Sequence, residues 1–265
     1  SRQFYREMNI GTAKPSHGEL AAVKHHFINS LSIKDKYTVF NYAQEVPHVL
    51  DTVFANSDFA LLSGGSGLFV KAAYQGLDEM PSIDKKLRDD LNKQFVEKGL
   101  EELQKQLKVL DPVYYKEVDL KNPRRLVRAL EVCLTTGSPF SSFRTLKPNS
   151  TPYHCIKIGL TLNKNSLYKK IDTRVDSMIN MGLVAEAKSL FGYRQLPPLQ
   201  TVGYKELFNY FQGQYDLDTA VKAIKKNSRN YAKRQFTWFK KDKEFNWFNP
   251  NDLEGIIAFV ESEMK

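Results

Sequence analysis

Apolar residues recur at every third or fourth position in the middle of the chain, a spacing that predicts amphipathic helices. Between Asp84 and Leu110 the leucines and Phe95 follow this spacing with charged residues between them, and Gly99 divides the run into two helices. Another helix is predicted from Asn122-Pro123, where asparagine can cap the first turn and proline fits it, to Thr136-Gly137.

Strand patterns lie on both sides of this helical middle. Phe59 to Leu62 is a short apolar run that enters a glycine-rich turn, which predicts a strand, a turn and the start of a helix. His154 to Leu162 alternates well enough to predict a second strand, and Phe245 to Phe248 predicts a terminal one.

Helical patterns separate these strands and set the fold class. Ser166 to Phe191 predicts helices with a break at Met181-Gly182, and Thr219 to Lys241 predicts one long helix. Alternating strands and helices favour an α/β fold with a parallel-sheet core. We assign residues 1–77 and 148–265 to this core and residues 78–147 to a helical insertion domain.

Composition narrows the class of partner. The chain has 265 residues, 42% of them hydrophobic, and a formal net charge of +9 with abundant aromatic residues. This combination suits a polyanion such as nucleic acid, although many proteins are mildly basic, so both interpretations stay open. No apolar stretch approaches the roughly 20 residues of a membrane span. Cys133 and Cys155 have no metal-ligand spacing, which favours reduced thiols and a cytoplasmic protein.

The Ser-Gly-Gly-Ser-Gly turn at residues 63–67 is a candidate anion-binding loop. Its glycines would let backbone N–H groups point into a site at a helix N-terminus, and Ser66 is the side chain in it that could act. The turn is neither a Walker A loop nor G-x-G-x-x-G. Taken alone, it is better explained as a packing turn.

Two clusters of cations are candidates for contact with phosphates. Arg124, Arg125 and Arg128 lie within about one helical turn with no acid before Glu131, so phosphate contact is slightly favoured over pairing with acids from elsewhere. The predicted helix from Thr219 to Lys241 contains no acidic residue. Four of its cations recur on one face, which favours a helix facing a polyanion; they are Lys222, Lys226, Arg229 and Lys233.

These segments, taken in order, resemble the tRNA dimethylallyltransferase family, also called tRNA isopentenyltransferases. The resemblance runs along nearly the whole chain, through SRQFYREMNIGTAKP, HHFINS, LLSGGSGLFVKAAYQGL, NPRRLVRALEV, RVDSMINMGLVAEA, VGYKEL and AKRQFTWFK. Each match is moderately specific, and their shared order makes the assignment strong.

The resemblance implies a reaction and a fold. The family transfers a dimethylallyl group from dimethylallyl diphosphate to N6 of adenosine 37, beside the anticodon of tRNAs that read codons beginning with U. Diphosphate leaves, and Mg²⁺ assists. The implied fold is a P-loop-kinase-like α/β core with a helical insertion domain that contacts tRNA. We further expect a monomer in the cytoplasm, with no membrane partner.

The resemblance also implies roles for individual residues. Ser1, Arg2 and Gln3 would line the adenine pocket, with Gln3 hydrogen-bonded to the base, and Arg174 would reach the diphosphate. Without the resemblance, Arg174 would be interpreted as an ordinary arginine on a helix surface. The remaining positions would contact tRNA; they are Ser66, Arg88, Arg124, Arg125, Leu126, Val127, Arg128, Arg229, Lys233 and Arg234.

The sequence departs from the family pattern at its start. The family has a Walker-A-like loop that cradles the diphosphate, and a general-base Asp directly before the position of Ser1. These 265 residues contain no G-x-x-x-x-G-K-[ST]. We expect a preceding segment of a few dozen residues to carry both features, and we expect the chain to be inactive without it.

Three other functions remain as alternatives. An adenylate isopentenyltransferase would act on free AMP, ADP or ATP, but a mononucleotide does not need the basic helix or the Arg124–Arg128 cluster. A non-catalytic RNA-binding remnant would keep the basic surface without the chemistry. A small-molecule kinase is disfavoured by the missing Walker A loop.

Overall fold

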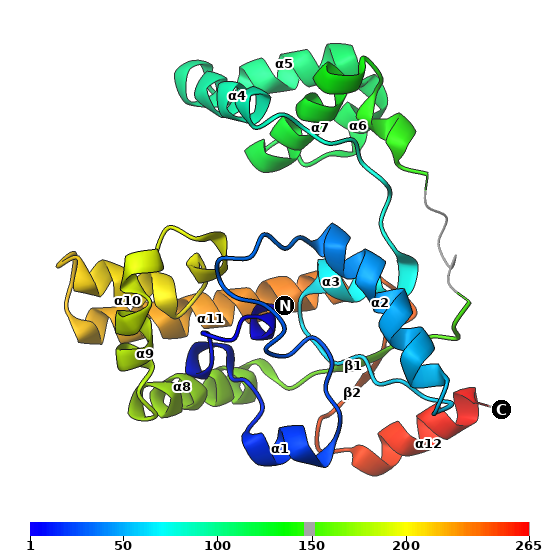
Figure 1. The fold of residues 1–265 in the computed structure, drawn as a ribbon, viewed down its shortest axis with the longest axis vertical. Helices are drawn as coiled ribbons and strands as arrows, with labels where there is room; N and C mark the ends of the chain where they lie inside the picture. The colour runs from blue at the N-terminus through cyan, green and yellow to red at the C-terminus, as the bar shows by residue number, and fades with distance from the viewer. Residues whose placement is uncertain (146–151, 265) are drawn as a thin grey trace. The chain divides into compact units, whose positions relative to one another are not determined.

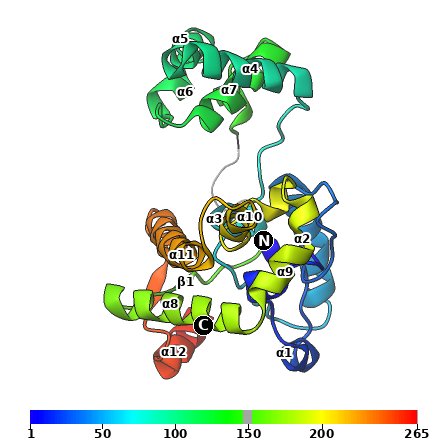
Figure 2. The same cartoon turned by 90° about the vertical axis from the view of Figure 1, so that its left-hand side faces the viewer.

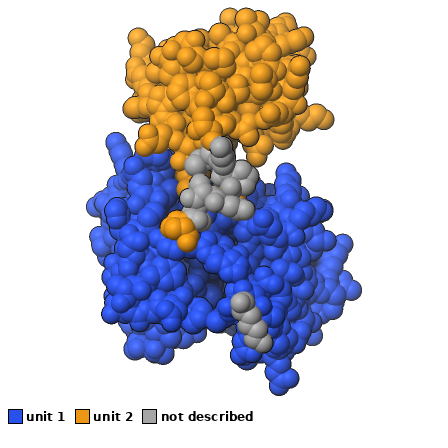
Figure 3. All heavy atoms as spheres, turned by 90° about the vertical axis from the view of Figure 1, so that its right-hand side faces the viewer, with its two compact units in different colours: residues 1–74, 153–265 blue, residues 75–152 orange. Residues whose placement is uncertain are grey.

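The chain folds into two units. The computed structural model describes residues 1–145 and 152–264. Unit 1 comprises Ser1–Tyr74 and Tyr153–Lys265, and unit 2 comprises Gln75–Pro152 (Figures 1 and 3). The C-terminal limit predicted for the insertion, residue 147, lies outside the described residues.

Unit 1 contains a parallel pair of short strands. Strand β1 (Ile158–Leu160) pairs with β2 (Asn246–Phe248) in the register Ile158↔Asn246 (Figure 1). Gly159 is needed because a Cβ atom there would lie 2.6 Å from the Trp247 ring. The strand predicted at Phe59 to Leu62 is not formed: this stretch pairs with no other strand among the described residues, and Leu61 is 95% exposed.

Helices make up most of unit 1. The chain between β1 and β2 supplies four of them, as the crossover between parallel strands requires. The long helices are α2 Val39–Phe54, α3 Gly67–Gln75, α8 Lys164–Asn180, α11 Leu217–Phe239 and α12 Leu253–Glu263. The shorter elements are η1 Arg2–Phe4, η2 Ile10–Thr12, α1 His17–Ala22, α9 Leu183–Ser189, η4 Phe191–Tyr193, η5 Pro197–Leu199 and α10 Tyr204–Phe211.

The C-terminal helices of unit 1 pack around a common core. Helix α11 packs against α8 and α10, and α10 packs against α9 (Figures 1 and 2). The predicted break at Met181-Gly182 is confirmed: α8 ends at Asn180, and Gly182 has a φ of +102°, which glycine adopts readily. Six residues of this core are completely buried; they are Leu183, Ala187, Leu199, Tyr204, Leu207 and Ala220.

The described part of unit 2 is a helical bundle whose helices follow the predicted pattern. Its elements are α4 Lys85–Lys98, α5 Leu100–Leu110, α6 Pro112–Glu117, α7 Pro123–Thr136 and η3 Phe140–Phe143. As predicted, Gly99 separates α4 from α5, Asn122 caps α7, and Gly137 ends α7 in the left-handed conformation. Leucines from α4, α5 and α7 form the core, and Leu103, Leu107 and Leu130 are completely buried.

Unit 2 also buries a carboxylate whose hydrogen bonds are satisfied. Asp111, 0% exposed, accepts hydrogen bonds from the N–H of Tyr114 at 2.9 Å and from the N–H of Ser141 at 2.7 Å. The Ser141 hydroxyl donates a further bond at 2.9 Å. Asp111 therefore caps α6 and fastens the η3 segment to it, which offsets the cost of burying its charge.

Candidate functional site

Gln3 lies in η1 and is held by a neighbouring loop. Its amide nitrogen Nε2 donates hydrogen bonds to the carbonyl oxygens of Thr12 at 3.2 Å and Ala13 at 2.8 Å. Ser1 is exposed, while Arg2 and Gln3 are half-buried. The three residues predicted to line the adenine pocket therefore lie together on one short turn, and Gln3 has a fixed side chain.

Phe4 anchors this turn in an aromatic cluster. The Phe4 ring lies 5.5 Å from Tyr37, 5.7 Å from Tyr42 and 5.6 Å from Phe69, measured between centroids. Phe27 also packs on Phe4 and Tyr42. Burial raises the pKa of Tyr42 to about 12, so this hydroxyl stays protonated at neutral pH. The cluster gives the turn a rigid apolar base.

Strained backbone surrounds Gln3. Ala13, Phe27 and Asn29 have positive φ values of 46°, 62° and 56°, a conformation that costs a residue with a side chain about 1–3 kcal/mol. Ala13 accepts a hydrogen bond from the Gln3 side chain, and the N–H of Asn29 donates to the Gln3 carbonyl at 3.1 Å. Such strain gathers at functional sites, because folding alone does not favour it.

Lys14 links three segments around Gln3 through hydrogen bonds. Its ammonium group donates to the carbonyl of Tyr5 at 2.8 Å, to Oδ1 of Asn9 at 2.9 Å and to Oδ1 of Asn29 at 2.5 Å. Partial burial lowers the pKa of Lys14 below its ordinary value, against the opposing effect of Glu186. The sequence analysis missed Lys14 because its partners lie in loops that periodicity does not describe.

The glycine-rich turn at residues 63–67 packs against α11. The Nε2 of Gln235 donates to the Gly65 carbonyl at 2.8 Å. A Cβ atom on Gly67 would lie 2.1 Å from Cδ1 of Trp238. Ser66 is half-buried at the N-terminus of α3, where its carbonyl accepts from the N–H of Val70. Close packing explains the glycines at positions 65 and 67, which agrees with the interpretation as a packing turn.

Two cations in the first part of α11 form ion pairs with carboxylates of α8. Nη1 of Arg229 lies 2.6 Å from the Asp172 carboxylate, and Nζ of Lys225 lies 2.6 Å from that of Asp176. The contact with a polyanion predicted for Arg229 stays a prediction, because this arginine already binds a carboxylate. Its charge is compensated within unit 1, because α8 places carboxylates opposite it.

The second part of α11 and the turn directly after it carry cations without such partners among the described residues. Among the described residues, no ion pair involves Lys233, Arg234 or Lys241. Together with Thr237 and Trp238 they line a shallow groove of about 250 Å³. Trp238 is 39% exposed, so an indole ring lies beside three positive charges. Phosphates and stacked bases of RNA suit such a surface.

Arg174 is exposed on α8, away from the residues that pair with α11. Two positions along an α-helix correspond to a rotation of about 200°, so Arg174 points away from Asp172 and Asp176. It can therefore bind an anion without competing for those carboxylates. Val175, the next residue, is 3% exposed and fixes the orientation of this face.

In unit 2, Glu131 brings two of the predicted arginines together. Nη2 of Arg88 lies 2.9 Å from one carboxylate oxygen of Glu131, and its Nε contacts the other. Nη1 of Arg128 lies 3.3 Å from the same group. The Glu131 side chain is 1% exposed, whereas those of Arg88 and Arg128 are 52% and 36% exposed. Two cations share one buried anion, so a positive charge remains at the surface.

The other residues of this segment separate into two faces. Arg124 and Arg125 are exposed and available to a phosphate. Leu126 and Val127, 0% and 6% exposed, lie in the core of unit 2. Their predicted contact with tRNA is corrected accordingly: these side chains pack α7 against its neighbours, as their helical spacing requires.

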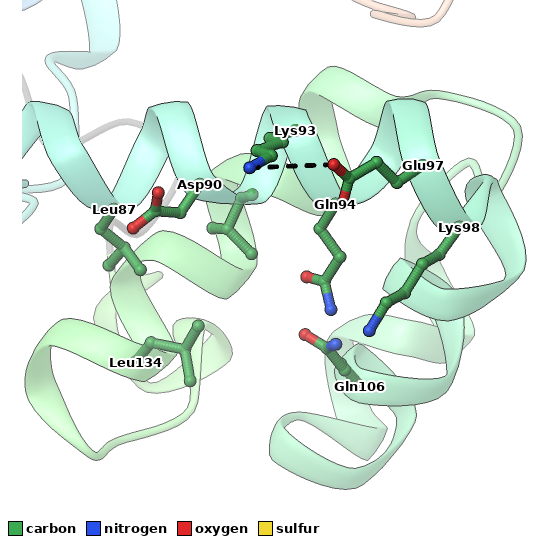
Figure 4. Close-up of a pocket in the computed structure, with 9 residues that line it drawn as sticks. Leu87, Asp90, Lys93, Gln94, Glu97, Lys98, Gln106 and Leu134 are labelled. Carbon is green, nitrogen blue, oxygen red and sulfur yellow. Dashed lines mark ion pairs between the residues drawn. The ribbon is translucent and has the colours of Figure 1, made fainter.

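A pocket of about 400 Å³ opens elsewhere in unit 2 (Figure 4). Gln94, Lys98 and Gln106 point toward one another across it, and Lys93 forms an ion pair with Glu97 at 3.8 Å. Leucine side chains complete the lining. None of the residues predicted to contact a substrate lines this pocket.

The described residues contain no cluster of three or more His, Cys, Asp or Glu side chains able to hold a metal ion. They therefore do not fit a preformed cage for the expected Mg²⁺. None of the described helices is long and apolar enough to cross a membrane.

Comparison with known proteins identifies relatives along the whole chain. Residues 3–242 match the family model described as IPP transferase. A tRNA dimethylallyltransferase of Christiangramia forsetii is 47% identical over 265 residues, which is 100% of this chain and 88% of that protein. The tRNA dimethylallyltransferase 1 of Bacteroides fragilis is 44% identical with the same coverage.

Solved structures share the fold. The tRNA isopentenylpyrophosphate transferase of Bacillus halodurans has a TM-score of 0.71 at 32% identity, over 99% of this chain and 86% of that one. A eukaryotic dimethylallyltransferase acting on tRNA has a TM-score of 0.78 at 20% identity, over 96% of this chain and 67% of that one. These likenesses confirm the predicted fold class.

Proposed function

This chain belongs to the IPP transferase family, and we propose that it transfers a dimethylallyl group from dimethylallyl diphosphate to N6 of adenosine 37 in tRNA. The acceptors are tRNAs that read codons beginning with U, and the products are N6-isopentenyladenosine and diphosphate. The observation that carries the proposal is similarity to tRNA dimethylallyltransferases over the full length of the chain.

We assign the orientation of the acceptor amine to the N-terminal turn. The exocyclic nitrogen of adenine is a poor nucleophile because its lone pair is delocalised into the ring, so it needs orientation and removal of a proton. The base must also leave the stack of the anticodon loop. In the proposed reaction Ser1, Arg2 and Gln3 receive the extruded base, and Gln3 orients it through a hydrogen bond.

The leaving diphosphate needs positive charge where its own charge develops. We assign this role to Arg174, which is exposed and directed away from the carboxylates Asp172 and Asp176. Arg174→Ala is expected to lower kcat by about tenfold or more with little loss of tRNA affinity. Single-turnover transfer and tRNA binding, measured on the same preparation, test this division of roles. Equal losses in both would show that Arg174 serves RNA binding instead.

Binding of tRNA is assigned to cations that have no carboxylate partner or share one. In unit 1 these are Lys233 and Arg234 on the groove of α11, with Ser66 at the neighbouring turn. In unit 2 the assigned cations are arginines of α4 and α7 that are exposed or half-buried, namely Arg88, Arg124, Arg125 and Arg128. Their side chains can contact phosphates, which supply most of the affinity in RNA binding.

The metal requirement stays a prediction. Mg²⁺ commonly binds through substrate phosphates with only one or two protein carboxylates, and the described residues form no larger cluster. No step is therefore assigned to a metal held by this chain. Transfer measured with dimethylallyl diphosphate before and after addition of a chelator tests the expectation.

One assay separates the proposal from its alternatives. The full-length protein is incubated with labelled dimethylallyl diphosphate and either unmodified tRNA or AMP. Transfer to tRNA alone supports the proposal, whereas transfer to AMP supports an adenylate isopentenyltransferase. Binding of tRNA without transfer to either acceptor identifies a non-catalytic RNA-binding protein. The exposed cationic groove favours the first outcome, because a mononucleotide needs no such surface.

A further inference from the structure

The carboxylate of Glu186 in α9 is surrounded by hydrogen-bond donors from two distant parts of unit 1. It accepts bonds from the N–H groups of Asn9 at 3.1 Å, Ile10 at 2.8 Å and Gly11 at 3.0 Å. The hydroxyl of Tyr204, in α10, donates a fourth bond at 2.6 Å. Helix α9 lies beside the N-terminal segment in both views (Figures 1 and 2).

This arrangement holds the chain around η2 at close range. Tyr204 is completely buried, and a Cβ atom on Gly11 would lie 2.6 Å from its ring. Burial, followed by the hydrogen bond to Glu186, raises the pKa of Tyr204 far above its ordinary value, so the hydroxyl keeps the proton it donates. Glu186 and Tyr204 therefore form a clamp on residues 9–11.

The clamped turn leads directly to the loop that orients Gln3. Thr12 and Ala13 follow the turn, and their carbonyls accept the two hydrogen bonds from Nε2 of Gln3. An amide nitrogen has two hydrogens, and both are used. The nitrogen must face this loop because only a donor can satisfy two carbonyl oxygens. The Oε1 atom is thereby left as the group that Gln3 offers to a substrate.

We propose that Glu186 and Tyr204 are positioning residues that fix the Gln3 side chain so that its Oε1 accepts a hydrogen bond from the exocyclic amine of the acceptor base. This inference rests on the proposed function. A 6-amino purine offers an N–H to Oε1, whereas a 6-oxo purine presents a second acceptor and leaves both oxygens unpaired. The clamp therefore contributes to the choice of adenine as well as to its orientation.

The clamp also explains how the strained loop persists. Ala13 has a φ of 46°, and Thr12 closes the loop by donating its hydroxyl to the Met8 carbonyl at 2.8 Å. Without the bonds from residues 9–11 to Glu186, the loop can relax and Gln3 loses its orientation. A displacement of about 1 Å at a reacting group can cost about a hundredfold in rate.

Glu186→Gln is the most informative variant. It preserves shape, but the amide nitrogen must face a donor, since all four partners donate. We expect kcat for tRNA to fall by about 10- to 100-fold while KM for tRNA stays within about twofold. Tyr204→Phe removes one of the four bonds and should give a smaller loss of kcat. Glu261→Gln, the same change at an exposed position of α12, should leave kcat unchanged.

A double-mutant cycle separates positioning from general destabilisation. If Glu186 acts through Gln3, then Glu186→Gln introduced into a Gln3→Ala background should lower kcat by less than about twofold more. A role in folding alone would lower kcat equally in both backgrounds, and that result would overturn the inference. Should Glu186→Gln fail to fold, the same cycle with Tyr204→Phe decides the question.

The design distinguishes failure of the clamp from failure of the proposed function. Wild-type protein that transfers dimethylallyl groups to tRNA, combined with additive losses in the cycle, refutes the clamp alone. Full-length wild-type protein that modifies no tRNA refutes the proposed function and the catalytic part of the inference. In that case hydrogen exchange at Ile10 and Gly11 still measures whether Glu186 holds the turn, with faster exchange expected in Glu186→Gln.

Discussion

The two parts of α11 should respond differently to loss of a positive charge. Lys233 lines the exposed groove and has no ion pair among the described residues, whereas Arg229 binds Asp172 at 2.6 Å. Lys233→Ala and Arg229→Ala each remove one charge from the same helix, so their long-range electrostatic effects match. We expect only Lys233→Ala to remove a contact with a phosphate.

The magnitude follows from counterion release. One lost phosphate contact lowers the slope of log affinity against log salt by about 0.7–0.9. Between about 50 and 200 mM salt, the ratio of wild-type to Lys233→Ala affinity should therefore shrink by about threefold. For Arg229→Ala this ratio should stay constant, and the variant should instead unfold more readily, because Asp172 loses its partner.

Equilibrium binding of labelled tRNA at four or five salt concentrations measures both slopes, and thermal unfolding of the same samples measures stability. If Arg229→Ala reduced the salt slope as much as Lys233→Ala, the ion pair with Asp172 would not persist in the complex. The assignment of a structural and a binding part to α11 would then be wrong.

Two further predictions concern side-chain packing, and a third concerns the pKa of a carboxylate. Gly67→Ala should cost about 1–3 kcal/mol of stability in thermal unfolding, because its Cβ would overlap Trp238; Gly64→Ala, whose nearest contact would be at 3.8 Å, should cost little. Leu107→Ala should lower the free energy of unfolding by about 2–5 kcal/mol, measured by hydrogen exchange in unit 2, against less than about 0.5 kcal/mol for Val109→Ala, which is 79% exposed. Burial acts to raise the pKa of Glu7, but the hydrogen bonds from Ser32 and Ile33 outweigh it and lower the pKa below 4.5. The stability from this carboxylate is thus present above about pH 4.5 and is lost as the pH falls through the folded-state pKa, so denaturant titrations should show Glu7→Gln less stable near neutrality and the difference closing in acid.

Local signals explain which elements the sequence predicts well. Asn122, Pro123 and Gly137 bound α7 because capping and left-handed termination depend on the residue at the boundary itself. The strand expected at Phe59 to Leu62 does not form, because it depends on more than a local signal. An apolar run shows only a preference for the strand conformation, whereas a strand also requires a hydrogen-bonded partner elsewhere in the chain.

The role of a residue is difficult to predict from the sequence when its interaction partner lies far away in the chain. Arg229 differs from Lys233 in its ion pair with Asp172, which is 57 positions earlier. Glu186 meets the N–H of Ile10 across 176 positions, and no spacing rule connects the two. For Leu126 and Val127, the expected contact with tRNA rests on the resemblance alone, and the burial of both side chains becomes visible only once α7 packs in the core of unit 2.

The two parts of α11 differ in their ion pairs because each part packs against a different segment of unit 1. The first part buries Ala220 and Ile224, and helix α8 opposes it with carboxylates that pair with Lys225 and Arg229. The second part rests on the turn at residues 63–67, which contains only serine and glycine and can offer no compensating charge. Glycine at position 67 also lets Trp238 approach closely while part of the indole stays exposed. By packing without charge, the glycine-rich turn leaves the groove cations uncompensated, and in the proposed function these cations bind the phosphates of tRNA.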